Sequence, residues 1–213
     1  MQENKTILVT QFYIPDDIER YQELKYCVKE NIANDLIDQI ILVVEKGILD
    51  KLIPNHKKIK TVLVKKRPSY KDLFKIGNSN INGKGLIIVA NSDIFYKEDD
   101  IVKMQVISNR QALALSRWDF KPDTEPKHHD TWDSQDTWVF KDLILPGKYN
   151  IKLGLPGCDN KIAYELQKAG YEVRNPSKTI KSYHYHTSDH RTYKEEDRVK
   201  EPYLFINTEE WVK

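Results

Sequence analysis

A carboxylate follows a run of apolar residues in the segment GLIIVANSDIFY, residues 85–96. The apolar run predicts a buried strand, and Asn91, Ser92 and Asp93 come directly after it. Ligands of an open parallel sheet bind beyond the carboxyl ends of its strands. Asp93 is therefore a candidate ligand for a divalent cation at that edge, although aspartate also stabilises turns without any ligand.

Two histidines lie near the other end of the chain, in SYHYHTSDHRTY, residues 182–193. On a strand, the side chains of His184 and His186 point to the same side, about 6–7 Å apart. One or both could complete an oxygen-rich metal site or contact a diphosphate, with Arg191 adding positive charge. A pair of half-exposed histidines between tyrosines explains the pattern equally well.

Further carboxylates precede a predicted helix and a predicted strand. Asp159 lies at the start of GCDNKIAYELQKAG, where it could be the N-cap of a helix or the general base for a hydroxyl acceptor. Asp133 and Asp136 lie between two tryptophans in WDSQDTWVF, residues 132–140. Carboxylates beside indoles are typical of sugar sites, and a tryptophan-rich core beside a solvated loop is the alternative.

The elements that must position these residues alternate between strands and helices. Strands are predicted at residues 6–10, 39–44, 59–64, 85–90, 110–115, 136–140 and 178–186, and helices at 16–33, 69–77 and 160–169. Residues 117–135 are expected to form a long polar loop, of which 120–135 is a candidate lid. The order predicts an α/β fold: a single domain with a mostly parallel central sheet and helices on both faces.

Several polar groups would meet at the carboxyl edge of this sheet. They are Thr10, Gln11 and Tyr13 after the first strand, Lys65 and Arg67 after the third, and Asn91, Ser92 and Asp93 after the fourth. An aromatic ring can pack on a base, cations can meet phosphates, and an acid can hold a divalent ion. Neither a Walker loop nor a G-x-G-x-x-G motif is present, so metal and side chains would have to neutralise a nucleotide.

Composition favours a reduced, globular protein and gives no sign of a nucleic-acid partner. The 213 residues carry a net charge of +2, too small to indicate nucleic acid or an acidic membrane. No apolar run is long enough to span a bilayer, and no secretory signal is expected. Cys27 and Cys158 fit neither a disulfide framework nor a zinc site. We therefore expect a cytoplasmic protein.

Three segments resemble GT-A-fold glycosyltransferases: IIVANSDIFY, SQDTWVF and GCDNKIAYELQKAGYEVRNPSKTIKSYHYHTS. The last segment is similar to a block in small glycosyltransferases of bacteria and large DNA viruses. The compact size of the chain is similar to that of the capsid-glycan glycosyltransferase domain of a chlorella virus. The resemblance implies a GT-A-like domain over residues 1–213, possessing a nucleotide-binding half (1–96) and an acceptor half (97–213). It also implies a UDP-sugar donor, Mn²⁺ or Mg²⁺, and a glycan or glycoprotein acceptor, in the host cytoplasm if the protein is viral. The chain could be one domain of a longer protein.

The resemblance assigns roles to single residues. Asp93 matches the second acid of the D-x-D metal motif, whereas Asn91 departs from the first. His184 or His186 would be a further metal ligand, and Thr10, Gln11 and Tyr13 would line the uridine pocket. Asp159 would face the acceptor and Asp136 the donor sugar. A sugar nucleotidyltransferase and a glycan-binding module without enzymatic activity are the alternatives.

Overall fold

The computed structural model of the chain describes residues 4–47, 52–187 and 195–211. Its helices are α1 (Ile18–Ala33), α2 (Tyr70–Asn80), α3 (Glu98–Met104), α4 (Cys158–Lys168) and the short 3₁₀ helix η2 (Glu195–Asp197). Its strands are β1 (Lys5–Phe12), β2 (Gln39–Glu45), β3 (Ile59–Val64), β4 (Gly85–Ala90), β5 (Ile94–Phe95), β6 (Gln111–Leu115), β7 (Arg117–Asp119), β8 (Lys127–His128), β9 (Thr137–Lys141), β10 (Glu172–Arg174) and β11 (Ser182–His184).

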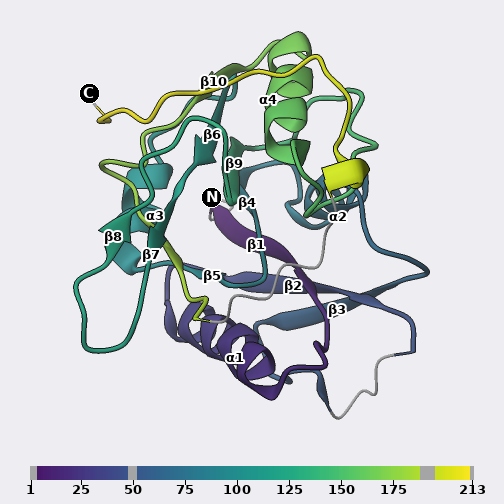
Figure 1. The fold of residues 1–213 in the computed structure, drawn as a ribbon, viewed down its shortest axis with the longest axis vertical. Coiled ribbons are helices and arrows are strands. Elements are labelled where there is room, and N and C mark those ends of the chain that lie inside the picture. Colours follow the sequence, from purple (N-terminus) through teal and green to yellow (C-terminus); the bar gives the residue numbers. More distant parts are fainter. Residues whose placement is uncertain (1–3, 48–51, 188–194, 212–213) are drawn as a thin grey trace.

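A seven-stranded sheet forms the centre of the molecule, with the strand order β10-β6-β9-β4-β1-β2-β3. All neighbouring strands are parallel except β9, which runs antiparallel to both β4 and β6. In Figure 1 the strands lie between α1 below and α4 above. The predicted mostly parallel sheet with helices on both faces is confirmed.

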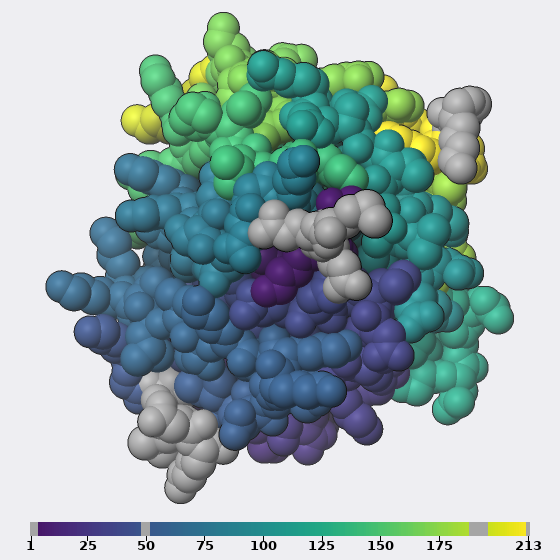
Figure 2. Space-filling model, turned by 180° about the vertical axis from the view of Figure 1, so that it is seen from behind, coloured from purple at the N-terminus to yellow at the C-terminus, as the bar shows by residue number. Residues whose placement is uncertain are grey.

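The helices cover both faces because the central strands are apolar on both sides. Ile7 and Val9 of β1 pack in one cluster with residues of α2 and α4, and Leu8 packs in a second cluster with residues of α1 and α3. Each fully buried aliphatic side chain of this kind stabilises the fold by about 1.5–3 kcal/mol. Seen from behind, the N-terminal part of the chain covers the lower surface, and teal and green residues cover most of the rest (Figure 2).

The second helix begins as the sequence predicts but ends later. Ser69 is its N-cap and forms a capping box with Asp72. The helix continues through Gly77 to Asn80, so the predicted end at Gly77 is wrong. A Cβ atom at position 77 would lie 2.8 Å from Cγ2 of Ile87, so this glycine lets α2 pack closely on β4.

A second, four-stranded sheet with the order β5-β11-β7-β8 forms beside the first. The prediction of a loop over residues 117–135 is wrong at β7 and β8, two strands that lie inside this range. The predicted 178–186 strand shortens to β11. The sequence reasoning also missed α3 and β10.

The segment after η2 returns across α4 (Figure 1). The Val199 amide donates a hydrogen bond to Pro156, and the Leu204 amide donates one to Asn160. No helix among the described residues has both the length and the apolarity to cross a membrane. Cys27 and Cys158 are both buried and free.

Candidate functional site

The antiparallel direction of β9 brings Asp136 to the edge where β4 and β6 end. Ala90, the last residue of β4, pairs with Thr137, the first of β9. Asn91 and Asp136 are therefore neighbours: the Asn91 amide donates to the Asp136 carbonyl at 3.0 Å, and Nδ2 of Asn91 donates to Oδ1 of Asp136 at 2.6 Å. Residues 91 and 136, both predicted as site residues, lie together.

Asp93 is the buried centre of a charged cluster. Its Oδ2 atom lies 3.2 Å from Nε2 of His184 and 3.9 Å from Nδ1 of His186. Pairing of β11 with β5 sets this geometry, because His184 pairs with Ile94 and the Tyr185 amide donates to the Asp93 carbonyl at 3.0 Å. The structure thus brings Asp93, His184 and His186 together, and the Asp93 carboxylate contacts the imidazole rings of both histidines.

Helix α1 adds two residues that the sequence reasoning missed. Arg20 donates hydrogen bonds to Asp93 and to Glu23, the latter at 2.8 Å. Glu23 also accepts from the amide and the hydroxyl of Thr187, both at 2.6 Å. Arg20 and Glu23 are buried among Leu24 and Val28 on the inner face of α1. Charged residues on the face of a helix that is otherwise apolar were the available signal.

Strand β7 supplies a second layer of charges behind His184. Asp119 pairs with His184 across the small sheet, and its Oδ1 lies 3.1 Å from Nδ1 of His184. Arg117 donates to Asp119 at 2.9 Å and to Oδ2 of Asp136 at 3.4 Å. These contacts connect the Asp93 cluster to the pair formed by Asn91 and Asp136.

The charges of this cluster shift each other's pKa values. Burial disfavours the ionised form of Asp93, but His184 and Arg20 outweigh it and hold its pKa well below the ordinary value. Burial likewise opposes the charged form of His184, yet Asp93 and Asp119 raise its pKa to about 9. Burial and the charge of Arg20 lower the pKa of His186. In this form of the site Asp93 is an anion, and His184 carries a proton that a metal ion would have to displace.

The residues around Asp93 fit a divalent cation. One ligand atom each of Asp93, His184 and His186 lies within 4.8 Å of the other two. Oδ1 of Asp93 and Nε2 of His186 are buried and have no hydrogen-bond partner among the described residues. Within the part of the chain that the structure describes, four carboxylates, those of Glu23, Asp93, Asp119 and Asp136, contact two guanidinium groups. Mixed histidine and carboxylate ligands are compatible with Mn²⁺.

Asp159 lies in the first turn of α4, where it is not the N-cap. That position belongs to Gly157, in a left-handed conformation, and no side chain caps the helix, so the N-cap interpretation is wrong. Oδ1 of Asp159 accepts from the hydroxyl of Tyr70 at 3.1 Å. Burial, with the nearby charge of Asp136, raises the pKa of Asp159 to about 7, and the Cys158 thiol donates to its carboxylate at 3.3 Å. A carboxyl that titrates near neutral pH suits proton transfer.

The remaining predicted residues are more widely spread. Thr10 is buried near the end of β1, and Gln11 donates to Glu45 of β2 at 3.4 Å. Tyr13 lies close enough to Arg20 to affect its pKa. Ser92 lies between Asn91 and Asp93 and is partly buried.

The cations after β3 do not reach the Asp93 cluster. Lys65 is exposed, and Arg67 lies against Gly154. No contact among the described residues joins either of them to Asp93. Arg191 lies outside the described residues.

The fold is the GT-A-like α/β fold. A solved structure that shares it is S. aureus TarS, residues 1–349, with a TM-score of 0.52 and 10% sequence identity over 85% of this chain and 60% of that one. A 4-diphosphocytidyl-2C-methyl-D-erythritol synthase from Anaerococcus prevotii has a TM-score of 0.42 and 13% identity, over 65% of this chain and 71% of the other. A second 4-diphosphocytidyl-2C-methyl-D-erythritol synthase has a TM-score of 0.44 and 10% sequence identity, over 65% of this chain and 74% of that one. Comparison with protein families and with curated proteins finds no match.

Proposed function

We propose that the protein is a glycosyltransferase that moves a sugar from a nucleotide-sugar donor, a UDP-sugar, to a hydroxyl group of a glycan or glycoprotein. The observation that carries this proposal is the cluster that Asp93, which follows β4, forms with His184 and His186 of the β11 region, at the predicted metal-binding position. The GT-A-like fold supports it, because ligands of open α/β sheets bind at this edge.

The chain's own residues would bind the donor on both sides of Asp93. Thr10 and Gln11, near the end of the neighbouring strand β1, and Tyr13, which follows that strand, are proposed to hold the uridine. Asn91 and Ser92 lie between β4 and Asp93 and are proposed to contact the ribose and diphosphate. Lys65, Arg67 and Arg191 remain proposed diphosphate contacts, the first two requiring a change in side-chain position.

Asp93, His184 and His186 would hold Mn²⁺ or Mg²⁺. When bound, such an ion neutralises charge on the departing diphosphate as a Lewis acid. Asp119 orients His184 through Nδ1, so that Nε2 faces Asp93. Arg20, which forms an ion pair with Asp93, is a cation whose side chain can turn toward the diphosphate.

Asp159 is proposed to take the proton from the acceptor hydroxyl if the reaction inverts the configuration of the sugar. Its pKa of about 7 places it close to half ionised at neutral pH. Asp136, held by Asn91 and Arg117, is proposed to contact hydroxyl groups of the donor sugar. In a retaining reaction Asp159 would bind the acceptor hydroxyl without removing its proton, and the leaving phosphate could accept it.

Binding of UDP in the presence and absence of metal tests the proposal. We expect UDP with Mn²⁺ to raise the melting temperature, and UDP with a chelator to leave it unchanged. With metal present, UDP-sugars should be hydrolysed slowly to UDP and free sugar. Release of pyrophosphate from a nucleoside triphosphate and a sugar phosphate would instead indicate a nucleotidyltransferase. No response to any nucleotide would favour a glycan-binding module.

A further inference from the structure

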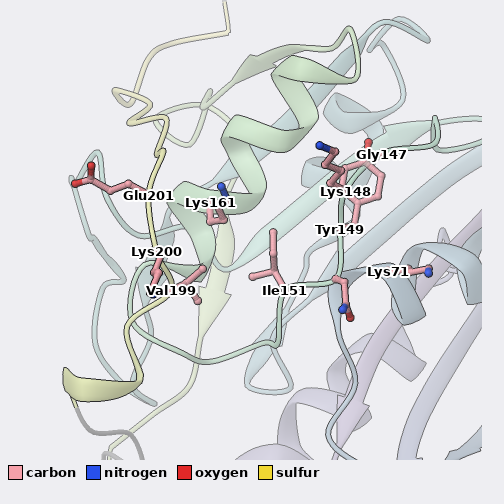
Figure 3. Close-up of a pocket in the computed structure, with 10 residues that line it drawn as sticks. Lys71, Gly147, Lys148, Tyr149, Ile151, Lys161, Val199, Lys200 and Glu201 are labelled. Atoms are coloured by element: carbon pink, nitrogen blue, oxygen red, sulfur yellow. The ribbon is translucent and has the colours of Figure 1, made fainter.

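A hollow of about 520 Å³ lies on the face of the sheet that α2 and α4 cover, outside the Asp93 cluster. Its walls come from the first turn of α2, residues 147–151, α4, and residues 199–201 of the returning segment. Figure 3 shows Lys161 on α4 and Lys148 on the loop opposite, with Ile151 between them. This volume is in the range of sites for small organic ligands.

Lysines line this hollow, which we call the lysine pocket. They are Lys71, Lys148, Lys161 and Lys200, and Glu201 is the one acid among the described residues of the wall. Figure 3 shows the Glu201 carboxylate directed away from the lysine side chains. Lys161 pairs with Glu165 at 3.3 Å, but no carboxylate of a described residue lies within 4 Å of the other three ammonium groups. The pocket therefore has an excess of positive charge.

A buried hydroxyl in the wall has no hydrogen-bond partner in the described part of the chain. Tyr149 is only 4% exposed, and its hydroxyl forms no hydrogen bond with a described residue. The ring lies over Gly147, where a Cβ atom would be 2.4 Å from Cζ of Tyr149. Burial raises the pKa of Tyr149, so the hydroxyl stays protonated and can donate. An anion that reaches this wall would accept the unused hydrogen bond.

The helices that hold Asp159 and its partner Tyr70 also form two walls of the pocket. Lys71 follows Tyr70, whose hydroxyl donates to Asp159, and Lys161 lies two residues after Asp159 on α4. The amides of Tyr70 and Lys71 donate to the carbonyls of Ile151 and Tyr149, which fixes the loop against α2. The pocket and the proposed general base are therefore built on the same two helices, and Asp159 itself is not one of the lining residues.

We infer that the lysine pocket binds a phosphorylated sugar unit. On the function proposed above, this unit belongs to the acceptor, and the pocket holds its phosphate. Lysine ammonium groups bind phosphate as point charges, and the volume leaves room for a sugar beside the phosphate. Inorganic phosphate carries the same charged group without the sugar, so the two ligands can be told apart by affinity.

The test measures binding of glucose 6-phosphate, inorganic phosphate and glucose by calorimetry, with a chelator present and at constant ionic strength. We expect glucose 6-phosphate to bind about fivefold tighter than inorganic phosphate, and glucose not to bind. Lys71→Ala/Lys161→Ala should weaken glucose 6-phosphate binding about tenfold. The matched variant Lys75→Ala/Lys168→Ala, with two exposed lysines removed from the same helices, should weaken it less than about twofold. Tyr149→Phe should weaken binding about threefold with no loss of melting temperature.

Equal losses of glucose 6-phosphate affinity in the two double-lysine variants would overturn the pocket as the binding site, because the loss would then result from the net charge of the protein and not from the position of the lysines. Equal affinity for inorganic phosphate and glucose 6-phosphate would overturn the claim that the pocket recognises the sugar. Absence of binding by glucose 6-phosphate would overturn the whole inference. The Lys71→Ala/Lys161→Ala variant should keep the response to UDP and Mn²⁺. Glucose 6-phosphate binding in a protein that ignores UDP and Mn²⁺ would support the pocket and contradict only the proposed function.

Discussion

The guanidinium group of Arg20 on α1 contacts Oδ2 of Asp93, the oxygen that also faces His184 and His186. The other oxygen, Oδ1, is buried and has no hydrogen-bond partner among the described residues. A divalent cation at Asp93 would therefore lie beside Arg20, and the two positive charges repel. Metal binding and the ion pair between Arg20 and Asp93 should compete.

Replacing Arg20 by glutamine tests this competition. We expect Arg20→Gln to bind Mn²⁺ about tenfold more tightly by calorimetry, because a positive charge beside the ligands is lost. Without metal, the variant should be less stable toward urea by about 3 kcal/mol, because one partner of a buried ion pair is missing. Arg110→Gln, at an exposed position, is the control and should change neither quantity. Unchanged Mn²⁺ affinity in Arg20→Gln would contradict the competition.

Replacing Asp93 by asparagine should remove the function while keeping the fold. We expect metal-dependent hydrolysis of a UDP-sugar to fall at least about 100-fold, because an amide is a much weaker ligand for a cation than a carboxylate. Circular dichroism should show unchanged secondary structure. Asp35→Asn, at a side chain that is 91% exposed, is the matched control. Activity close to that of the control would show that Asp93 binds no catalytic metal.

The sequence was sufficient to predict the central strands and the position of Asp93 at the edge of the sheet. The continuous apolar runs of β2 and β4 mark strands buried on both faces, and a carboxylate after β4 then has to lie at the edge of the sheet. The start of α2 was equally readable, because Ser69 is a residue type that commonly caps helices. These features depend on residues close together in the chain.

Features that depend on residues far apart in the chain could not be read from it. An apolar strand has the same pattern in either direction, so nothing in the sequence of β9 showed that it runs antiparallel and brings Asp136 to Asn91. Strand β7 has three residues, none fully buried, and lacks the alternation that marks a strand. Its residues Arg117 and Asp119 were therefore assigned to a loop.

Asp119 should act on metal binding through His184. Its Oδ1 lies 3.1 Å from Nδ1 of His184 and orients the ring so that Nε2 faces Asp93. We expect Asp119→Ala to lower Mn²⁺ affinity about tenfold, as is usual when a carboxylate behind a metal-binding histidine is lost. Asp119→Asn, which can still accept a hydrogen bond, should recover part of that affinity. Equal affinity in the wild type and Asp119→Ala would mean that His184 is not a ligand.

The pH dependence of sugar transfer tests Asp159. Because its pKa is raised to about 7 by burial and by Asp136, the rate should rise about tenfold per pH unit below pH 7 and level off above it. Asp136→Asn removes the neighbouring charge, so the midpoint should move below pH 7. Asp159→Asn should slow transfer at least about 100-fold. A flat profile in the wild type would contradict a general base at this position.

Stability measured against pH gives a second readout that needs no substrate. The carboxyl of Asp159 has an ordinary pKa of 3.8 and one of about 7 when folded, so the folded state holds this proton more tightly than the unfolded state. Its contribution to the free energy of unfolding should therefore fall as the pH rises from about 4 to 7 and then stay constant. Asp159→Asn lacks the proton and should lose this part of the slope, measured by urea unfolding at a series of pH values. An identical slope in the variant would show that Asp159 titrates in the folded protein as it does in water, and the physical basis for its role as a base near neutral pH would be gone.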